Sequence, residues 1–295
     1  MFERIAIIGL GLIGGSLARA LRAKGLVGEV VGCGRDEHNL QRGIALGVID
    51  RYSTNPAEAV HDADLVVLAT TLGATSEVCR RIAPGLAPQA LITDVGSTKR
   101  SVVEAARAHL GPALSRFVPG HPIAGGEKSG VEASTETLFE RHRVILTPVS
   151  ETASFAVGKV RRMWEATGAE VTLMEVDHHD LVLAATSHLP HLLAFALVDC
   201  LASAGSGDGR STGEIFDYAA GGFRDFTRIA SSNPDMWRDI AMANRTALMA
   251  VCTRFEATLG ALKSAIDRED GAVLHATFTR AKKARDAYLT RRGLT

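Results

Sequence analysis

The chain has 295 residues, which predicts two domains of ordinary size, and 46% of them are hydrophobic, enough to bury a core in each. Lysine plus arginine and aspartate plus glutamate number 33 each, so the sequence offers no basic surface for nucleic acid. No unbroken apolar run approaches the roughly 20 residues that cross a membrane, and we expect no membrane partner.

Short apolar segments alternate with helix-compatible segments from residue 4 to about 147. They are rich in valine, isoleucine and leucine and lack polar–apolar alternation, which is typical of strands covered on both faces by crossover helices. The expected strands are 4–8, 30–33, 65–69, 91–95, 117–118 and 144–146. A helix over 152–167 and a strand over 171–173 should complete the domain. The pattern predicts a Rossmann-type α/β domain with a doubly wound parallel sheet over residues 1–175.

Strand-like segments disappear after Asp177, and helical periodicity continues to the end of the chain. We expect an all-α domain over residues 176–295. One helix should run from near His178 through Ser203, followed by a flexible break at 204–209. Asn233 and Pro234 should start another helix as its cap and first turn. Apolar residues then recur at three- or four-residue steps from Trp237 to Ile266, and such a stripe must be covered by its own domain or by a second subunit.

A glycine motif, Gly9-x-Gly11-x-x-Gly14, stands between the first strand and a helix. In that context Gly9 permits a tight turn, Gly11 lets the backbone approach a pyrophosphate, and Gly14 lets helix and strand pack closely. The helix N-terminus would face the phosphates. The motif therefore predicts a dinucleotide cofactor. The expected cofactor contacts are Gly9, Gly11, Leu12, Ile13, Gly14, Gly34, Arg35 and Thr70.

The end of the second strand bears on the choice between NAD and NADP. An NAD site usually carries an acidic residue there for the ribose 2′-hydroxyl, whereas this chain has Gly34 followed by Arg35. A small residue leaves room for a 2′-phosphate, and a guanidinium can pair with it, so NADP is favoured. Two alternatives remain: Asp36 could serve as the ribose acid, or Arg35 could point into solvent.

Four further motifs follow in order: DVGSTK at 94–99, HPIAGG at 121–126, SHLPH at 187–191 and GGFRDFTR at 221–228. Together with GLGLIGGS at 9–16, this ordered set resembles the prephenate/arogenate dehydrogenase family over residues 5 to about 240. The resemblance implies oxidation of a cyclohexadienol at C4 with loss of the ring carboxylate as carbon dioxide, in tyrosine biosynthesis.

The resemblance also assigns roles to particular residues. His121 matches the catalytic histidine, and an imidazole can accept the hydroxyl proton near neutral pH. Ser97 matches a serine that would orient this imidazole and keep it neutral. Substrate contacts are implied for the matching residues His188, His191, Arg228 and Trp237. The active site would lie between the two domains, and the helical domain would form a homodimer.

Several plainer interpretations stay open. His121 could hold a loop before Pro122, and His188 and His191 have a spacing seen in metal sites, although Pro190 separates them and no metal is expected. The segment from His178 to Asp180 is interpreted as a helix entry with a local cap. The four cysteines, Cys33, Cys79, Cys200 and Cys252, form no CxxC pair, which fits a reducing cytoplasm.

Two other functions also fit parts of the pattern. A 3-hydroxyacid dehydrogenase likewise joins a Rossmann domain to helices, but it should use a lysine in the helical domain, and Lys263 has no supporting motif. A catalytically silent dinucleotide sensor would bind cofactor without turnover, and the presence of His121 and Arg228 argues against it.

Overall fold

The computed structural model describes residues 1–126, 128–204 and 216–293. The chain forms two compact units, Met1–Arg245 and Thr246–Thr295. Apart from Ala204, the break expected at 204–209 lies outside the described residues.

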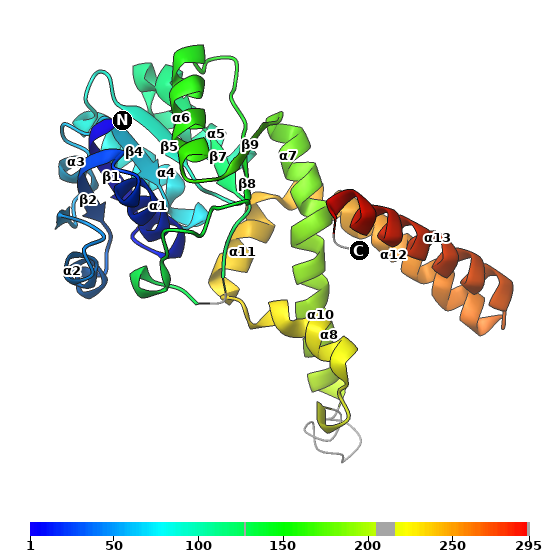
Figure 1. Cartoon of the computed structure of the whole chain (residues 1–295). Helices are drawn as coiled ribbons and strands as arrows, with labels where there is room; N and C mark the ends of the chain where they lie inside the picture. The colour runs from blue at the N-terminus through cyan, green and yellow to red at the C-terminus, as the bar shows by residue number, and fades with distance from the viewer. Residues whose placement is uncertain (127, 205–215, 294–295) are drawn as a thin grey trace. The chain divides into compact units, whose positions relative to one another are not determined.

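The first unit is built on a sheet of six parallel strands in the order β3-β2-β1-β4-β5-β6 (Figure 1). The strands are β1 (Phe2–Ile8), β2 (Val27–Cys33), β3 (Arg51–Ser53), β4 (Leu65–Leu68), β5 (Leu91–Asp94) and β6 (Phe117–Val118). The strand order reverses direction between β1 and β4, so the crevice that binds ligands in such folds is expected at the carboxyl ends of these two strands. The predicted parallel, doubly wound sheet is confirmed.

Apolar side chains of the central strands feed two separate cores. In β1, Ile5 and Ile7 belong to the core that includes α1 and α6, whereas Ala6 and Ile8 belong to the core that includes α3, α4 and α5. This division explains why the strands carry hydrophobic residues at consecutive positions, since both faces are covered by helices. The helices are α1 (Leu12–Ala23), α2 (Glu37–Ala45), α3 (Pro56–Ala59), α4 (Thr75–Ile82), α5 (Arg100–His109) and α6 (Ser154–Ala166).

The first unit also contains a second, separate sheet of three strands. It contains β7 (Gly120–Pro122), β8 (Arg143–Leu146) and β9 (Glu170–Leu173), with β8 antiparallel to β7 and parallel to β9. The expectation that 144–146 continues the parallel sheet is wrong, because β8 pairs with β7 and β9 in a separate sheet. Both β3 and β7 were missed because neither contains consecutive apolar residues, and β7 includes a glycine and a proline, which are depleted in strands.

The predicted helix from near His178 through Ser203 is confirmed as a continuous helical segment. It comprises α7 (Val176–Leu183), a π-helical turn over Ala184–His188, and α8 (Leu189–Ala204). By length and composition alone, residues 176–203 could cross a membrane, and 22% of the most apolar window is buried. The segment is not the unbroken apolar run that the sequence analysis looked for, because polar residues such as Asp180, His188 and Asp199 interrupt it. A single helix of this kind is weak evidence for a membrane span.

The predicted helix start at Asn233 is confirmed in α11 (Pro234–Ala243), which follows α10 (Gly221–Thr227). The Asn233 side chain accepts a hydrogen bond of 3.0 Å from the Met236 backbone N–H, and Pro234 occupies the first turn. The apolar stripe that begins at Trp237 does not form one helix, because α11 ends before Asn244.

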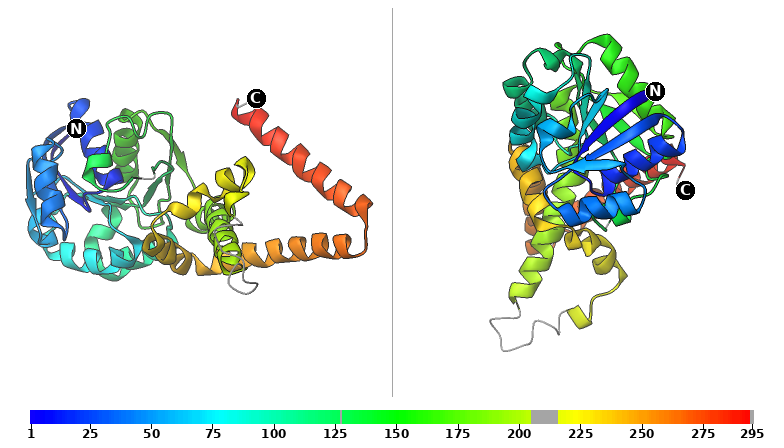
Figure 2. Two further views of the ribbon diagram at one scale, coloured as in Figure 1. Left: turned by 90° about the horizontal axis from the view of Figure 1, so that it is seen from below. Right: turned by 90° about the vertical axis from the view of Figure 1, so that its left-hand side faces the viewer.

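The second unit consists of two long helices, α12 (Arg245–Asp267, whose first residue closes the first unit) and α13 (Gly271–Arg292), joined by a short turn (Figure 2). The Asp270 side chain caps α13 by accepting a hydrogen bond of 3.0 Å from the Val273 N–H. Several large apolar side chains of these helices are exposed, among them Leu259, Ile266 and Phe278.

Candidate active site

The turn after β1 has the geometry of a phosphate-binding loop. Gly9 has a φ of +103°, and a Cβ atom there would lie 2.3 Å from the Ala69 carbonyl oxygen, so only glycine fits. A Cβ on Gly14 would lie 2.4 Å from the Gly9 carbonyl oxygen, which explains the close packing of α1 on β1. A Cβ on Gly11 would meet nothing within 4 Å. Gly11 precedes the first turn of α1, which has no side-chain cap, so the N–H groups near Leu12 and Ile13 are suited to an anion.

Thr70 adds a second feature at this edge, because it follows β4 on the other side of the crevice. Its hydroxyl oxygen is buried and has no hydrogen-bond partner among the described residues. A buried hydroxyl without a partner is costly unless a ligand supplies one. Together with the open space at Gly11, this orphan hydroxyl shows that the residues present fit a dinucleotide.

Arg35 and Asp36, shortly after the end of β2, are the two candidates for contact with the ribose of the cofactor. Arg35 is exposed, and Gly34 leaves ordinary van der Waals space beside Leu40. Asp36 caps α2, its carboxylate accepting a hydrogen bond of 3.2 Å from the Asn39 N–H. The Asp36 side chain is therefore already engaged, which argues against its use as the ribose acid.

A fully buried ion pair connects the end of β5 to the start of α5. The Lys99 ammonium contacts Asp94 and also donates a hydrogen bond of 2.6 Å to the Gly120 carbonyl. Asp94 in turn accepts from the Gly120 N–H at 3.0 Å and from the Gly96 N–H at 2.8 Å. Burial lowers the pKa of Lys99, and the adjacent Asp94 opposes that shift. These contacts fix the backbone of Gly120, the residue before His121.

His121 lies on β7 and is buried, with 9% of its surface exposed. Its Nδ1 lies 2.9 Å from Nε2 of His179, and no hydrogen bond to its own Nε2 occurs in the described part of the chain. Burial, together with the positive charge of Lys99, holds the pKa of His121 well below its usual value. The imidazole is therefore neutral at pH 7 and has a free nitrogen.

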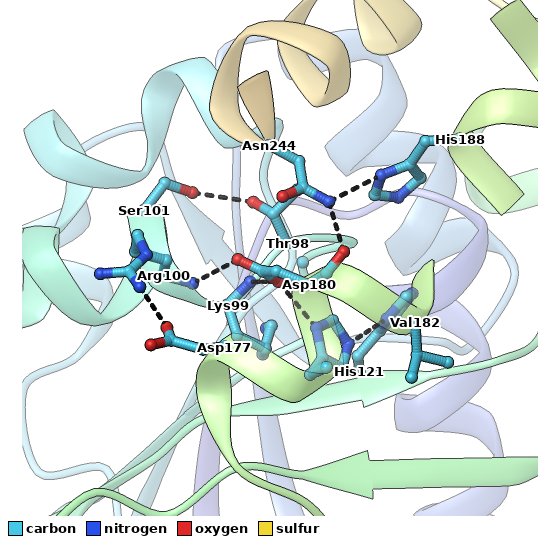
Figure 3. Close-up of polar contacts among 12 residues, drawn as sticks. Thr98, Lys99, Arg100, Ser101, His121, Asp177, Asp180, Val182, His188 and Asn244 are labelled. Carbon is cyan, nitrogen blue, oxygen red and sulfur yellow. Dashed lines mark hydrogen bonds and ion pairs between the residues drawn. The ribbon is translucent and has the colours of Figure 1, made fainter. Parts of the chain in front are cut away.

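His179 and Asp180 belong to α7, yet they contact residues from two other elements. Figure 3 shows Asp180 pointing toward Arg100. Nδ1 of His179 lies 2.8 Å from Oδ1 of Asp180. The Asp180 carboxylate also accepts from the N–H groups of Lys99 at 2.7 Å and Arg100 at 3.0 Å. Asp180 thus caps α5 rather than its own helix, and the expectation that this segment is only a local helix entry is wrong.

Asn244, the residue that follows α11 as its C-cap, forms hydrogen bonds with both α7 and the π-helical turn. Its amide nitrogen donates hydrogen bonds to the Asp180 carbonyl at 2.8 Å and to Nδ1 of His188 at 3.0 Å. His188 is 2% exposed, and burial lowers its pKa to about 4. His188 is consequently neutral, with its proton on Nε2 because Nδ1 accepts from Asn244.

His191 and Trp237 form a stacked pair, with ring centroids 3.6 Å apart and an interplanar angle of 20°. Nδ1 of His191 donates a hydrogen bond of 2.8 Å to the Ser187 carbonyl, so Nε2 remains available to accept one. Burial lowers the pKa of His191, and Arg228 adds to the shift, which means that the guanidinium charge is close to this ring. The Trp237 Nε1 is buried without a partner among the described residues. The structure therefore brings together three of the four predicted substrate contacts, namely His188, His191 and Trp237. The His188 ring packs edge-on against the Trp237 ring, with ring centroids 6.1 Å apart.

Ser97 differs from its predicted arrangement. In the described residues no hydrogen bond joins Ser97 to His121, whose Nδ1 is taken by His179. A contact between Ser97 and the substrate stays a prediction. His179, Asp180, Asn244 and the Asp94–Lys99 pair were not assigned to the site from sequence, and within the described residues no cluster suited to a metal occurs.

The fold and the site together define a dinucleotide-dependent oxidoreductase in which helices supply residues beside a Rossmann-type sheet. Comparison with known proteins narrows this class. Sequence profiles described as "Prephenate dehydrogenase, nucleotide-binding domain" and "Prephenate dehydrogenase, dimerization domain" match residues 17–173 and 175–280. The chain belongs to the prephenate dehydrogenase family.

Individual relatives cover nearly the whole chain. A cyclohexadienyl dehydrogenase of Zymomonas mobilis is 40% identical over 98% of this chain and 97% of its own length. The structure of prephenate dehydrogenase from A. aeolicus in complex with hydroxyphenyl propionate and NAD+ superposes with a TM-score of 0.90, at 37% identity over 98% of this chain and 99% of that one. Synechocystis arogenate dehydrogenase superposes with a TM-score of 0.80, at 28% identity over 97% of this chain and 100% of its own.

The buried ion pair leads to a stability prediction. Lys99→Met removes one partner and leaves the Asp94 carboxylate buried without its counter-ion, which should destabilise the protein by about 3–5 kcal/mol. Denaturant unfolding at pH 7 would measure the loss. Lys24→Met is the control, because Lys24 is exposed and should change stability by less than about 0.5 kcal/mol. Equal unfolding midpoints for the two variants would contradict the importance of the pair.

Proposed function

We propose that this chain oxidises prephenate, arogenate or both, with hydride transfer to a nicotinamide dinucleotide and loss of carbon dioxide, in tyrosine biosynthesis. The observation that carries the proposal is a buried, neutral His121 with a free Nε2, in a chain of this family. The residue before it, Gly120, bonds to Asp94 at the carboxyl end of β5 in the main sheet. A neutral imidazole at that position can act as a proton acceptor.

The reaction places separate demands on the residues of the chain. A bound nicotinamide would accept the hydride from C4 of the substrate. His121 Nε2 would accept the proton of the 4-hydroxyl group as the hydride leaves. The C1–carboxylate bond then breaks, its electron pair enters the ring as carbon dioxide departs, and the resulting phenolate takes the proton back from His121 to become the phenol. The chain's main contribution is to hold C4 and the hydroxyl in place and to receive that proton.

The substrate carboxylates require cationic or donor groups. We propose Arg228 as the carboxylate-binding residue, because its planar guanidinium has a fork of donors and its charge lies close to His191. The stacked His191–Trp237 pair, with its unpartnered indole N–H, would border the ring. His188 and Ser97 are proposed as further contacts. Prephenate and arogenate differ at a side-chain keto or amino group, and relatives named for either substrate resemble this chain.

The residues after β2 also bear on the choice between NADP and NAD. We propose that NADP is preferred over NAD, because Gly34 and Arg35 leave space and charge for a 2′-phosphate and Asp36 is engaged as a helix cap. A relative's complex contains NAD+, so both cofactors belong in any assay.

We also propose that residues 1–175 bind the dinucleotide, that residues 176–295 complete the substrate site, and that the chain acts in the cytoplasm. A homodimer through the helical region is supported by the family description of this region and by the exposed apolar residues Leu192, Met249 and Leu259. Sedimentation equilibrium should give twice the 31.2 kDa chain mass. A monomer at micromolar concentration would contradict the proposed dimer.

The alternative hydroxyacid dehydrogenase gains no support, because Lys263 is exposed on α12. A catalytically silent dinucleotide sensor would differ from the proposed enzyme only in showing no turnover. Reduced cofactor formation should be followed with prephenate and arogenate, each with NAD and NADP. An absence of turnover in all four combinations would contradict the proposed function.

His121→Asn should lower kcat by about 10²–10⁴-fold, because the amide cannot accept the hydroxyl proton. The dissociation constant for the cofactor should stay unchanged. In the wild type, kcat/KM should fall only well below pH 6.5, since burial lowers the pKa of His121 and the protonated ring cannot act as an acceptor. An unchanged kcat in this variant would remove His121 from the reaction.

Arg35→Ala should reduce kcat/KM with NADP by about 10–100-fold, which corresponds to the loss of charge-assisted hydrogen bonds to the 2′-phosphate. The value with NAD should not change. Asp36→Asn is the matched control, because an asparagine still caps α2, and NAD turnover should persist if Asp36 is not the ribose acid. Faster reaction of the wild type with NAD than with NADP would contradict the proposed preference.

A further inference from the structure

We propose that His179 and Asp180 are positioning residues that keep the proton of the resting His121 imidazole on Nδ1, so that Nε2 faces the substrate as the acceptor. This inference rests on the proposed function only for the role of His121. It is carried by a chain of three side chains on β7 and α7, joined by hydrogen bonds of 2.9 and 2.8 Å.

The direction of each hydrogen bond follows from the charge at the end of the chain. Burial would raise the pKa of Asp180, but hydrogen bonds from His179 and from the backbone N–H groups of Arg100 and Lys99 outweigh burial and leave the pKa below its usual value. Asp180 is therefore a carboxylate and can only accept. Consequently Nδ1 of His179 carries a hydrogen and donates to it.

The same reasoning extends to the next ring. Burial lowers the pKa of His179, against the hydrogen bond to Asp180, so the ring is neutral at pH 7. A neutral imidazole with a hydrogen on Nδ1 has none on Nε2, and Nε2 of His179 must accept from His121. Nδ1 of His121 then carries the hydrogen, and Nε2 of His121 has a free lone pair.

This order of donors leaves one place for the substrate proton. When His121 accepts the hydroxyl proton, it arrives at Nε2, and the two existing N–H hydrogens stay where they are. The resulting imidazolium donates a stronger hydrogen bond through Nδ1 to His179, whose other nitrogen remains bonded to the Asp180 anion. Without this chain the neutral ring could carry its hydrogen on Nε2, which would block the acceptor, a fault known to be costly in serine protease triads.

Other charged and titratable groups surround this chain. Lys99 faces both histidines, Asp94 lies close to His179, and His188 lies close to His121. Lys99 disfavours a second positive charge, so the Asp180 anion is the group that offsets charge developing on His121. The Asp180 carbonyl is held by Asn244, which limits rotation of this part of α7.

Nitrogen-15 NMR of histidine-labelled wild-type enzyme tests the proton position without substrate. The expected result is a protonated Nδ1 and an unprotonated Nε2 on His121, assigned by comparison with His121→Asn. A protonated Nε2 would overturn the proposal. Because this measurement needs no turnover, it remains valid even if His121 proves not to be the proton acceptor, which His121→Asn kinetics decide separately.

Two variants of His179 then test the consequence. His179→Leu removes the acceptor and should lower kcat by about 10²-fold or more, with KM within about twofold and Nε2 of His121 now protonated. His179→Gln keeps a carbonyl oxygen that can accept from Nδ1, and it should recover at least about tenfold of that loss. His178→Leu is the control one position earlier, because His178 is exposed and its change should leave kcat unaltered. A wild-type kcat in His179→Leu, or equal losses in the leucine and glutamine variants when both are folded by their circular dichroism, would overturn the proposal.

Discussion

The carboxylate of Asp180 is the interaction on which the arrangement of the site depends. It satisfies two backbone N–H groups at the start of α5, which follows a strand of the main sheet, and it accepts a hydrogen bond from the ring of His179. A negative charge at a helix N-terminus is favourable in itself. The same group therefore attaches the helical segment to the Rossmann-type sheet and sets the donor order of the histidines.

The Asp94–Lys99 pair complements this attachment from the sheet side. Its contacts with Gly120 fix the backbone that carries His121. His121 is thus held at its main chain by a buried charge pair and at its ring by the neutral His179, which in turn bonds to the Asp180 carboxylate. Such double support is expected where a side chain must be placed within a fraction of an ångström for proton transfer.

Much of the fold could be predicted from the sequence, because consecutive apolar residues in strands such as 65–68 and the glycines at 9, 11 and 14 are typical of few structures besides a buried parallel strand and a dinucleotide-binding turn. The short strands β3 and β7 and the second sheet could not, since β3 and β7 lack apolar runs and no local pattern shows which distant segments pair. The break between α11 and α12 at Asn244 was also missed, because the apolar stripe continues across it. A polar asparagine within that stripe was the one available signal.

Some residues of the site could likewise be predicted from the sequence, and others were found only in the structure. His121 and His191 stood in recognisable motifs and Trp237 was implied by the family resemblance, whereas His179 and Asp180 looked like an ordinary helix start. Their role arises from contacts with residues about 60 and 80 positions away, and no local pattern encodes such contacts. The buried charges of Asp94 and Lys99 could have been suspected, since both stand in the DVGSTK motif next to an apolar strand, but only the structure shows what they hold.

The π-helical turn over Ala184–His188 has a consequence for how this region can vary in length. A π-helical turn accommodates one more residue than an α-helical path would, and Pro190, which has no N–H to donate, lies two residues after its end. Deleting one residue here would return the turn to regular α-helical winding and leave the residues on either side close to their present orientation, whereas a deletion within a regular α-helix rotates every downstream position by about 100°. His191 would then still face the Trp237 ring, so the loss of one residue should be tolerated better in this turn than in the regular helices on either side of it.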